Sequence, residues 1–158
     1  LYSVRTLGFR GEALPSMAAV SRFEITTRET NADIGTHVQV EAGVVTDISE
    51  TGCREGTEIA IHNLFFNTPA RFKFLKSDQA EAARISEIVG HLALAYPHVS
   101  FRLRHNGNEL LRAEAGGNPL NAVAAVFGRE VARQMLPIAV DPEKRDEKSG
   151  EVIVSGFA

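Results

Sequence analysis

Several short segments with apolar residues on only one face limit the folds open to this chain. These segments are 21–29, 36–40, 44–48 and 57–64. In the first of them, Phe23 and Ile25 alternate with charged and hydroxyl-bearing residues, a pattern that is typical of half-buried strands. Strands of this kind pair in antiparallel or mixed sheets that are covered on one face by helices. The predicted fold class is therefore α+β.

Helical periodicity is clearest in the segment 77–95. Its apolar residues, which recur at three- and four-residue spacing, are Ile85, Ile88, Val89, Leu92 and Ala95. The spacing predicts a helix whose apolar stripe lies on the sheet. Pro97 should end this helix, because the residue before a proline is disfavoured in the helical region. Asn106-Gly107 then joins two alternating segments and predicts a β-hairpin.

Two further helices are predicted from their N-terminal residues. Thr68 and Pro69 are typical of an N-cap and a first helical position, and Asn118 and Pro119 repeat the signal. Gly128 is suited to end the second of these helices. The aromatic residues around the first helix, Phe65, Phe66, Phe72 and Phe74, are expected in the core. Beyond Gly128 we expect a strand at 131–140, a charged loop at 141–151 and a strand-like end.

Composition excludes several function classes. The chain has 158 residues, of which 44% are hydrophobic and 23% charged, as in a globular domain. Its net charge of -3 does not predict DNA binding by composition alone. Cys53 is the single cysteine, so no internal disulfide is possible, and with the five histidines it shows no zinc-type spacing. No apolar stretch approaches the length of a membrane span.

A glycine-bounded turn from Gly8 to Gly11 leads directly into the apolar run 14–20. Glycine tolerates positive φ and has no Cβ, so backbone N–H groups at such a turn can converge on one anion. A helix that begins just after Gly11 would add the positive end of its dipole, provided that Pro15 lies in the first turn. An ordinary turn is the alternative, since neither a P-loop nor a dinucleotide-binding glycine motif occurs.

Two longer strings carry a family resemblance. They are Thr6-Leu7-Gly8-Phe9-Arg10-Gly11-Glu12-Ala13-Leu14, and Gly56-Thr57-Glu58-Ile59 continuing through Leu64-Phe65-Phe66-Asn67-Thr68-Pro69-Ala70-Arg71-Phe72-Lys73-Phe74-Leu75. In order and spacing, both resemble signatures of the MutL family of DNA mismatch-repair ATPases. The resemblance implies the C-terminal part of a GHKL-type ATPase sandwich at 1–128. A second, ribosomal protein S5-like α/β domain would begin at 129–158.

The resemblance also implies a function for the intact protein. Such a protein would bind ATP with Mg²⁺, hydrolyse it, and use the cycle to form a homodimer and to couple mismatch recognition by MutS to strand removal. It would contact DNA weakly and act in the cytoplasm. The catalytic Glu, the Mg²⁺-binding Asn and the Asp-Gly adenine motif of such proteins precede the region that begins here. We therefore expect a fragment with no catalytic or metal-binding residue, inactive alone.

The resemblance assigns the candidate site residues. The candidates for the terminal phosphate of ATP are the backbone amides of Gly8, Phe9, Arg10, Gly11, Glu12, Ala13 and Leu14. Gly11 should be the least replaceable, because a side chain there would occupy the approach of the phosphate. Arg10 could contact the phosphate or hold the loop through a carboxylate, whereas Glu12 could be only a first-turn acid. Thr57 resembles the threonine whose hydroxyl helps to hold adenine, or it simply opens a strand.

Three alternatives remain at this point. A gyrase-like subunit and a heat-shock chaperone share the expected fold, although the two strings argue against both. A non-enzymatic binding module, in which the glycine turn is only a turn, belongs to a different class.

Overall fold

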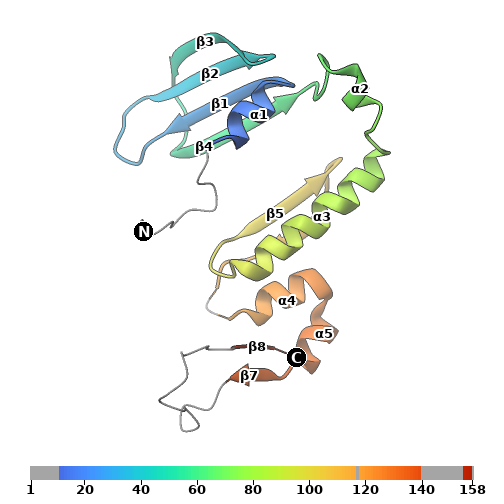
Figure 1. Ribbon diagram of the computed structural model, residues 1–158. Coiled ribbons are helices and arrows are strands. Elements are labelled where there is room, and N and C mark those ends of the chain that lie inside the picture. The colour runs from blue at the N-terminus through green and yellow to red at the C-terminus, as the bar shows by residue number, and fades with distance from the viewer. Residues whose placement is uncertain (1–10, 117, 140–154, 158) are drawn as a thin grey trace, which may run out of the picture. The chain divides into compact units, whose positions relative to one another are not determined.

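The computed structural model describes residues 11–116, 118–139 and 155–157, and the chain divides into two compact units, Leu1–Leu75 and Lys76–Ala158. Both units combine helices with antiparallel strands (Figure 1). The prediction of an α+β chain with antiparallel pairing is confirmed. Among the described residues, no helix is long and apolar enough to cross a membrane.

The first unit is built on a four-stranded antiparallel sheet with the strand order β3-β2-β1-β4 (Figure 1). Its elements are α1 (Ala13–Ala18), β1 (Arg22–Arg28), β2 (Gly35–Glu41), β3 (Val44–Thr51), β4 (Gly56–His62) and α2 (Pro69–Phe72). All four strands were expected from the alternating pattern. Strand β3 continues to Thr51, beyond the predicted end at Ile48, because its pairing with β2 extends to Gly35.

One face of this sheet is apolar, as the alternation predicts. Residues that pair directly across neighbouring strands share a face. The face consists of Phe23 and Ile25 on β1, Val38 and Val40 on β2, Val45 and Ile48 on β3, and Ile59 and Ile61 on β4. Phe23, on a central strand, is only 4% exposed, whereas Ile48 on the outer strand β3 is 66% exposed. The helix α1 contacts β1, and its Ala18 is buried.

The second unit packs helices on a two-stranded hairpin. Its elements are α3 (Asp78–Ala95), β5 (Phe101–His105), β6 (Asn108–Ala113), α4 (Leu120–Phe127), α5 (Arg129–Gln134), β7 (Pro137–Ala139) and β8 (Ser155–Phe157). The side chain of Ser77 caps α3, which ends before Tyr96 and Pro97 as predicted. Asn106 and Gly107 have positive φ values of 49° and 80° and join β5 to β6, so the predicted hairpin is also confirmed.

The contact face of α3 within this unit includes only part of the predicted stripe, namely Val89. Its most buried residues are Gly90 and Ala93, and Ala93 packs with Leu111 and Ala113 of β6. A Cβ at Gly90 would lie 3.3 Å from Val126 of α4, so small residues permit the close approach. The residues of the predicted stripe that remain half exposed are Ile85, Ile88 and Leu92.

The segment after Gly128 does not begin with the expected strand at 131–140. It forms the short helix α5 and then the three-residue strand β7, which pairs with β8. Gly128 has a φ of 94° and separates α4 from α5, and Arg133 lies 3.6 Å from Glu130 one turn earlier on α5. Val131 favoured a strand, but most of its neighbours are good helix formers. The charged loop at 141–151 lies outside the described residues.

Candidate functional site

Gly11 opens the described part of the candidate phosphate site. Its φ of +68° lies in the region that favours glycine, and a Cβ added there would meet no atom of the described residues within 4 Å. The helix α1 begins two residues later, so Pro15 falls in its first turn as predicted. The predicted helix was longer, since it extended to Val20. Gly8, Phe9 and Arg10 lie outside the described residues.

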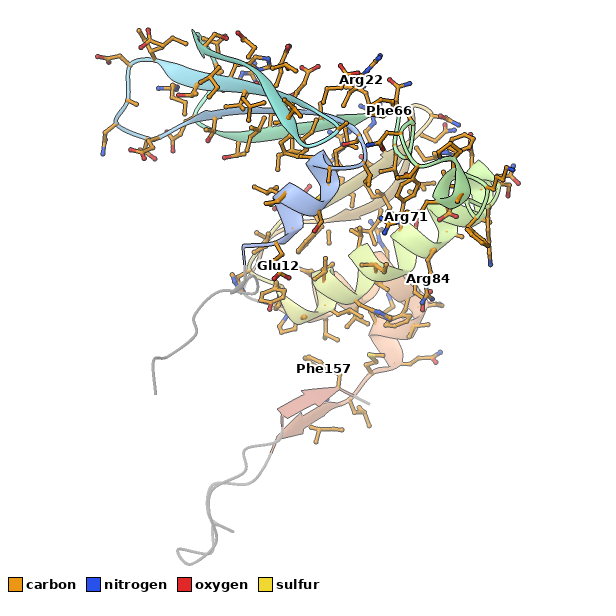
Figure 2. The ribbon with its side chains drawn as sticks, turned by 45° about the horizontal axis from the view of Figure 1, so that its top comes forward. Glu12, Arg22, Phe66, Arg71, Arg84 and Phe157 are labelled. Atoms are coloured by element: carbon orange, nitrogen blue, oxygen red, sulfur yellow. The ribbon has the colours of Figure 1, made fainter. Side chains whose placement is uncertain are left out.

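Glu12 occupies the N-cap of α1 rather than its first turn (Figure 2). Its backbone is already helical, with φ of -89° and ψ of -15°, and no side chain of the described residues caps this helix end. The interpretation of Glu12 as a first-turn acid was therefore wrong by one position. Because α1 has only six residues, its dipole is small, and backbone amides must supply most of any anion binding.

The second signature string is bonded to the turn that follows α1. The amide Nδ2 of Asn67 donates to the carbonyl oxygen of Ala19 at 2.9 Å. The backbone N–H of Phe65 donates to the carbonyl oxygen of Val20 at 2.7 Å. These two bonds tie the segment after β4 to the turn that follows α1. The second string is thus anchored to the end of α1, although 48 positions separate Asn67 from Ala19.

We call the contact between residues 19–20 and residues 65–67 the junction, and Ser21 stabilises the turn on its first side. Its side chain is fully buried, and its Oγ donates to the carbonyl oxygen of Met17 at 2.7 Å. The next residue, Arg22, places its guanidinium 5.5 Å from the ring centre of Phe66, within the range of a cation–π contact (Figure 2). Arg22 Nε also lies 3.3 Å from a carboxylate oxygen of Glu41.

The aromatic segment after β4 is more exposed than expected. The exposed fractions are 40% for Phe66, 58% for Phe72 and 84% for Phe74, so the prediction that these rings are core is wrong within this unit. A hollow of about 340 Å³ opens among them, lined by Asn63, Leu64, Phe65, Phe66, Pro69 and Phe72. Asn63 and Phe65 have positive φ values of 52° and 65°, which turn the chain away from the sheet.

Thr68 lies at the N-cap of α2, as predicted, with Pro69 at the first helical position. Its hydroxyl does not accept a helix N–H, however, and its Oγ1 is buried without a hydrogen-bond partner among the described residues. The backbone carbonyl of Thr68 accepts instead from the N–H groups of Arg71 and Phe72. The prediction was therefore right about the position and wrong about the capping bond.

Thr57 is the second residue of β4 and lies on the same face as Ile59 and Ile61. Its side chain is exposed, and its Oγ1 lies 2.8 Å from Oγ1 of Thr27, which is its direct partner on β1. The hydroxyl pair therefore forms a polar end to the otherwise apolar face. Sequence reasoning missed Thr27, because alternation places it on this face but does not identify its partner.

No group of three or more potential metal ligands is clustered within the part of the chain that the structure describes. Thr57 and the start of α1 both belong to the first unit, together with the sheet. The chemistry that these described residues offer is hydrogen bonding from backbone amides and hydroxyls beside an apolar surface.

Comparison with known proteins shows the family. No family model matches the chain. A relative from Halalkalibacterium halodurans, named DNA mismatch repair protein MutL, is 47% identical over 161 residues, which cover 100% of this chain and 24% of the relative. A relative of the same name from Desulforudis audaxviator is 51% identical over 138 residues, covering 87% of this chain and 24% of the relative. The chain thus spans about a quarter of the length of these curated relatives.

A solved structure shares the fold. The Aquifex aeolicus MutL ATPase domain complexed with ADP aligns with a TM-score of 0.75 and 32% sequence identity, covering 82% of this chain and 52% of that chain. The family expected from the two signature strings is therefore confirmed, in preference to a gyrase-like subunit or a chaperone. This chain belongs to the MutL family of DNA mismatch repair proteins and matches part of its ATPase domain.

Proposed function

We propose that the protein containing this chain is a mismatch-repair ATPase, and that the chain supplies the phosphate side and one adenine-side residue of its nucleotide site. The observation that carries the proposal is the match to a MutL ATPase domain that was solved with ADP bound. The geometry of Gly11 and Thr57 supports it at the level of individual residues.

The phosphate side is assigned to the backbone of the glycine turn and the start of α1. Its residues are Gly8, Phe9, Arg10, Gly11, Glu12, Ala13 and Leu14. Gly11 has a positive φ, and a Cβ placed on it would meet no atom of the described residues within 4 Å, which suits the close approach of a phosphate. No side chain of the described residues competes for the first N–H groups of α1. Thr57, at the polar end of the apolar sheet face, is assigned to the adenine base.

In the whole protein, bound ATP with Mg²⁺ would be hydrolysed in a cycle that drives homodimerisation and couples recognition by MutS to strand removal. DNA contacts would be weak, and the protein would act in the cytoplasm. We assign no Mg²⁺ ligand and no catalytic base to residues of this chain. We also propose that residues 129–158 begin the ribosomal protein S5-like domain, so that 1–128 belong to the ATPase domain.

The test is ATP binding by a full-length protein that carries this sequence. Gly11→Val should abolish measurable binding, because a branched side chain would stand where the phosphate approaches. Thr57→Val keeps strand propensity and deletes one hydroxyl, so it should weaken binding several-fold to about tenfold, as expected for one hydrogen bond of about 0.5 to 1.5 kcal/mol.

Gly107→Val is the matched control for the phosphate site. Gly107 also has a positive φ, of +80°, and open space beside it, but it lies in the β5–β6 hairpin of the second unit. It therefore reproduces the backbone strain without touching the proposed site. ATP binding by Gly11→Val equal to that of the Gly107→Val control would refute the phosphate assignment. Absence of ATP binding by the parent protein would instead favour a non-enzymatic binding module.

A further inference from the structure

Thr27 and Thr57 form a hydroxyl pair whose arrangement is set by the sheet. The two residues are direct partners in the antiparallel register of β1 and β4, and their Oγ1 atoms are 2.8 Å apart. Thr27 Oγ1 also donates to the carbonyl oxygen of Gly56 at 3.3 Å. Both side chains are exposed, so a ligand on this face can reach them.

Counting protons assigns the direction of the bond between the two hydroxyls. Each hydroxyl has one proton to donate and two lone pairs that accept, whereas a carbonyl oxygen only accepts. The bond to Gly56 therefore uses the proton of Thr27. Both bonds can then exist together only if Thr57 donates to Thr27. Thr57 keeps lone pairs but no proton for a ligand.

We propose that Thr27 is a positioning residue that turns the Thr57 hydroxyl into a hydrogen-bond acceptor and thereby selects an amino-purine nucleotide. This inference rests on the proposed function, because it places the base beside Thr57. As an acceptor, the Thr57 oxygen receives a hydrogen bond from the exocyclic 6-amino group of adenine. It repels the 6-carbonyl oxygen of hypoxanthine or guanine, and a site built for one polar group discriminates against a ligand that leaves that site unmatched.

The backbone around the pair is anchored independently of the two hydroxyls. The ladder between β1 and β4 continues on both sides of the pair, from Thr26 opposite Glu58 to Arg28 opposite Gly56. The side chain of Arg28 donates from Nε to the carbonyl oxygen of Cys53 at 2.8 Å. Valine has high strand propensity, so Thr27→Val should preserve this end of the sheet and remove only the hydroxyl.

The experiment compares the dissociation constants of ATP and inosine triphosphate for a full-length protein that carries this sequence. These two nucleotides differ at the 6-position of the purine, which is an amino group in one and a carbonyl in the other. Thr27→Val frees the proton of Thr57, which can then be donated to the carbonyl. The preference for ATP over inosine triphosphate should fall about three- to tenfold, which corresponds to one neutral hydrogen bond. Thr27→Ser retains the hydroxyl and should keep the parental preference.

A double-mutant cycle separates positioning from a merely structural role. In the Thr57→Val background, Thr27→Val should leave the preference between the two nucleotides unchanged, because the hydroxyl that Thr27 orients is absent. If Thr27→Val weakens both nucleotides equally, or leaves the parental preference intact, the inference is overturned. Thr27→Ala serves the same purpose if the valine variant does not fold.

Failure of the inference differs visibly from failure of the proposed function. If Thr57→Val weakens ATP binding while Thr27→Val leaves the preference unchanged, the adenine-side assignment stands and the positioning role is wrong. If Thr57→Val binds ATP as the parent does, the base is not beside Thr57, and both the assignment and the inference fall.

Discussion

Gly35 is the position where the structure predicts the sharpest effect of a single methyl group. A Cβ built on Gly35 would clash with Sγ of Cys53, and it would lie 2.8 Å from the carbonyl oxygen of Thr27 and 3.2 Å from Cβ of Arg28. The first contact involves a half-buried side chain, but the second involves the backbone of β1, which is held by β2 and β4 on its two sides. Gly35→Ala should therefore displace the end of β1 that carries Thr27.

The expected cost follows from two opposing terms. Overpacking of a tight site costs about 1 to 3 kcal/mol, and two contacts below 3.0 Å place Gly35 in the upper part of this range. Alanine also restricts the unfolded chain, which offsets about 0.4 to 1 kcal/mol. We expect Gly35→Ala to lower the free energy of unfolding by about 1 to 2.5 kcal/mol. Cys53→Ala in the same chain removes the nearest clashing atom and should restore about half of this loss.

Urea unfolding measured by circular dichroism provides the free energies, and Gly52→Ala is the control. Gly52 lies in the loop between β3 and β4, and a Cβ there meets no atom within 4 Å, so alanine should be neutral or slightly stabilising. The reasoning would be refuted by a Gly35→Ala protein as stable as the Gly52→Ala protein. A Gly35→Ala/Cys53→Ala protein no more stable than Gly35→Ala would show that the thiol is not the limiting contact.

Three further predictions concern the junction and the nucleotide. Ser21→Ala should cost about 1 kcal/mol of unfolding free energy, since it removes a buried hydrogen bond to Met17, whereas Ser49→Ala on the exposed surface should cost almost nothing; equal effects would contradict this. The chain by itself should release no phosphate from ATP above a no-protein control, and release that a substitution within this chain abolishes would be the opposing result. In the full-length protein, a non-hydrolysable ATP analogue should slow amide hydrogen exchange from Gly8 to Leu14, because a phosphate would accept hydrogen bonds from these N–H groups; unchanged exchange in a sample with bound analogue would exclude the turn.

Local features of the fold were predictable from the sequence because they depend on neighbouring residues. The positive φ at Gly11, the hairpin at Asn106-Gly107 and the end of α3 before Pro97 each follow from the conformational limits of glycine, asparagine or proline. The apolar face of the sheet followed from period-two alternation. The family resemblance required only the order and spacing of two strings.

Local patterns also led to errors where packing overrode them. The helix α5 replaced an expected strand. Within its own unit, α3 contacts the hairpin and α4 through Gly90, Ala93 and only one residue of the predicted stripe, Val89. The close approach of α3 and α4 decided which face of α3 makes contact, because even a Cβ at Gly90 would lie 3.3 Å from Val126. The three-dimensional fit of two helices is not encoded in the periodicity of either one.

The sequence by itself determined which residues share a strand face and identified Thr57 as a candidate for the adenine side. Only the tertiary structure decided that Thr27, thirty positions earlier in the chain, is the partner of Thr57. It likewise decided that Asn67 is bonded to Ala19. The physical reason is that alternation fixes the direction of a side chain, whereas its neighbour depends on strand order and register. Those two properties arise only when β1 is placed between β2 and β4.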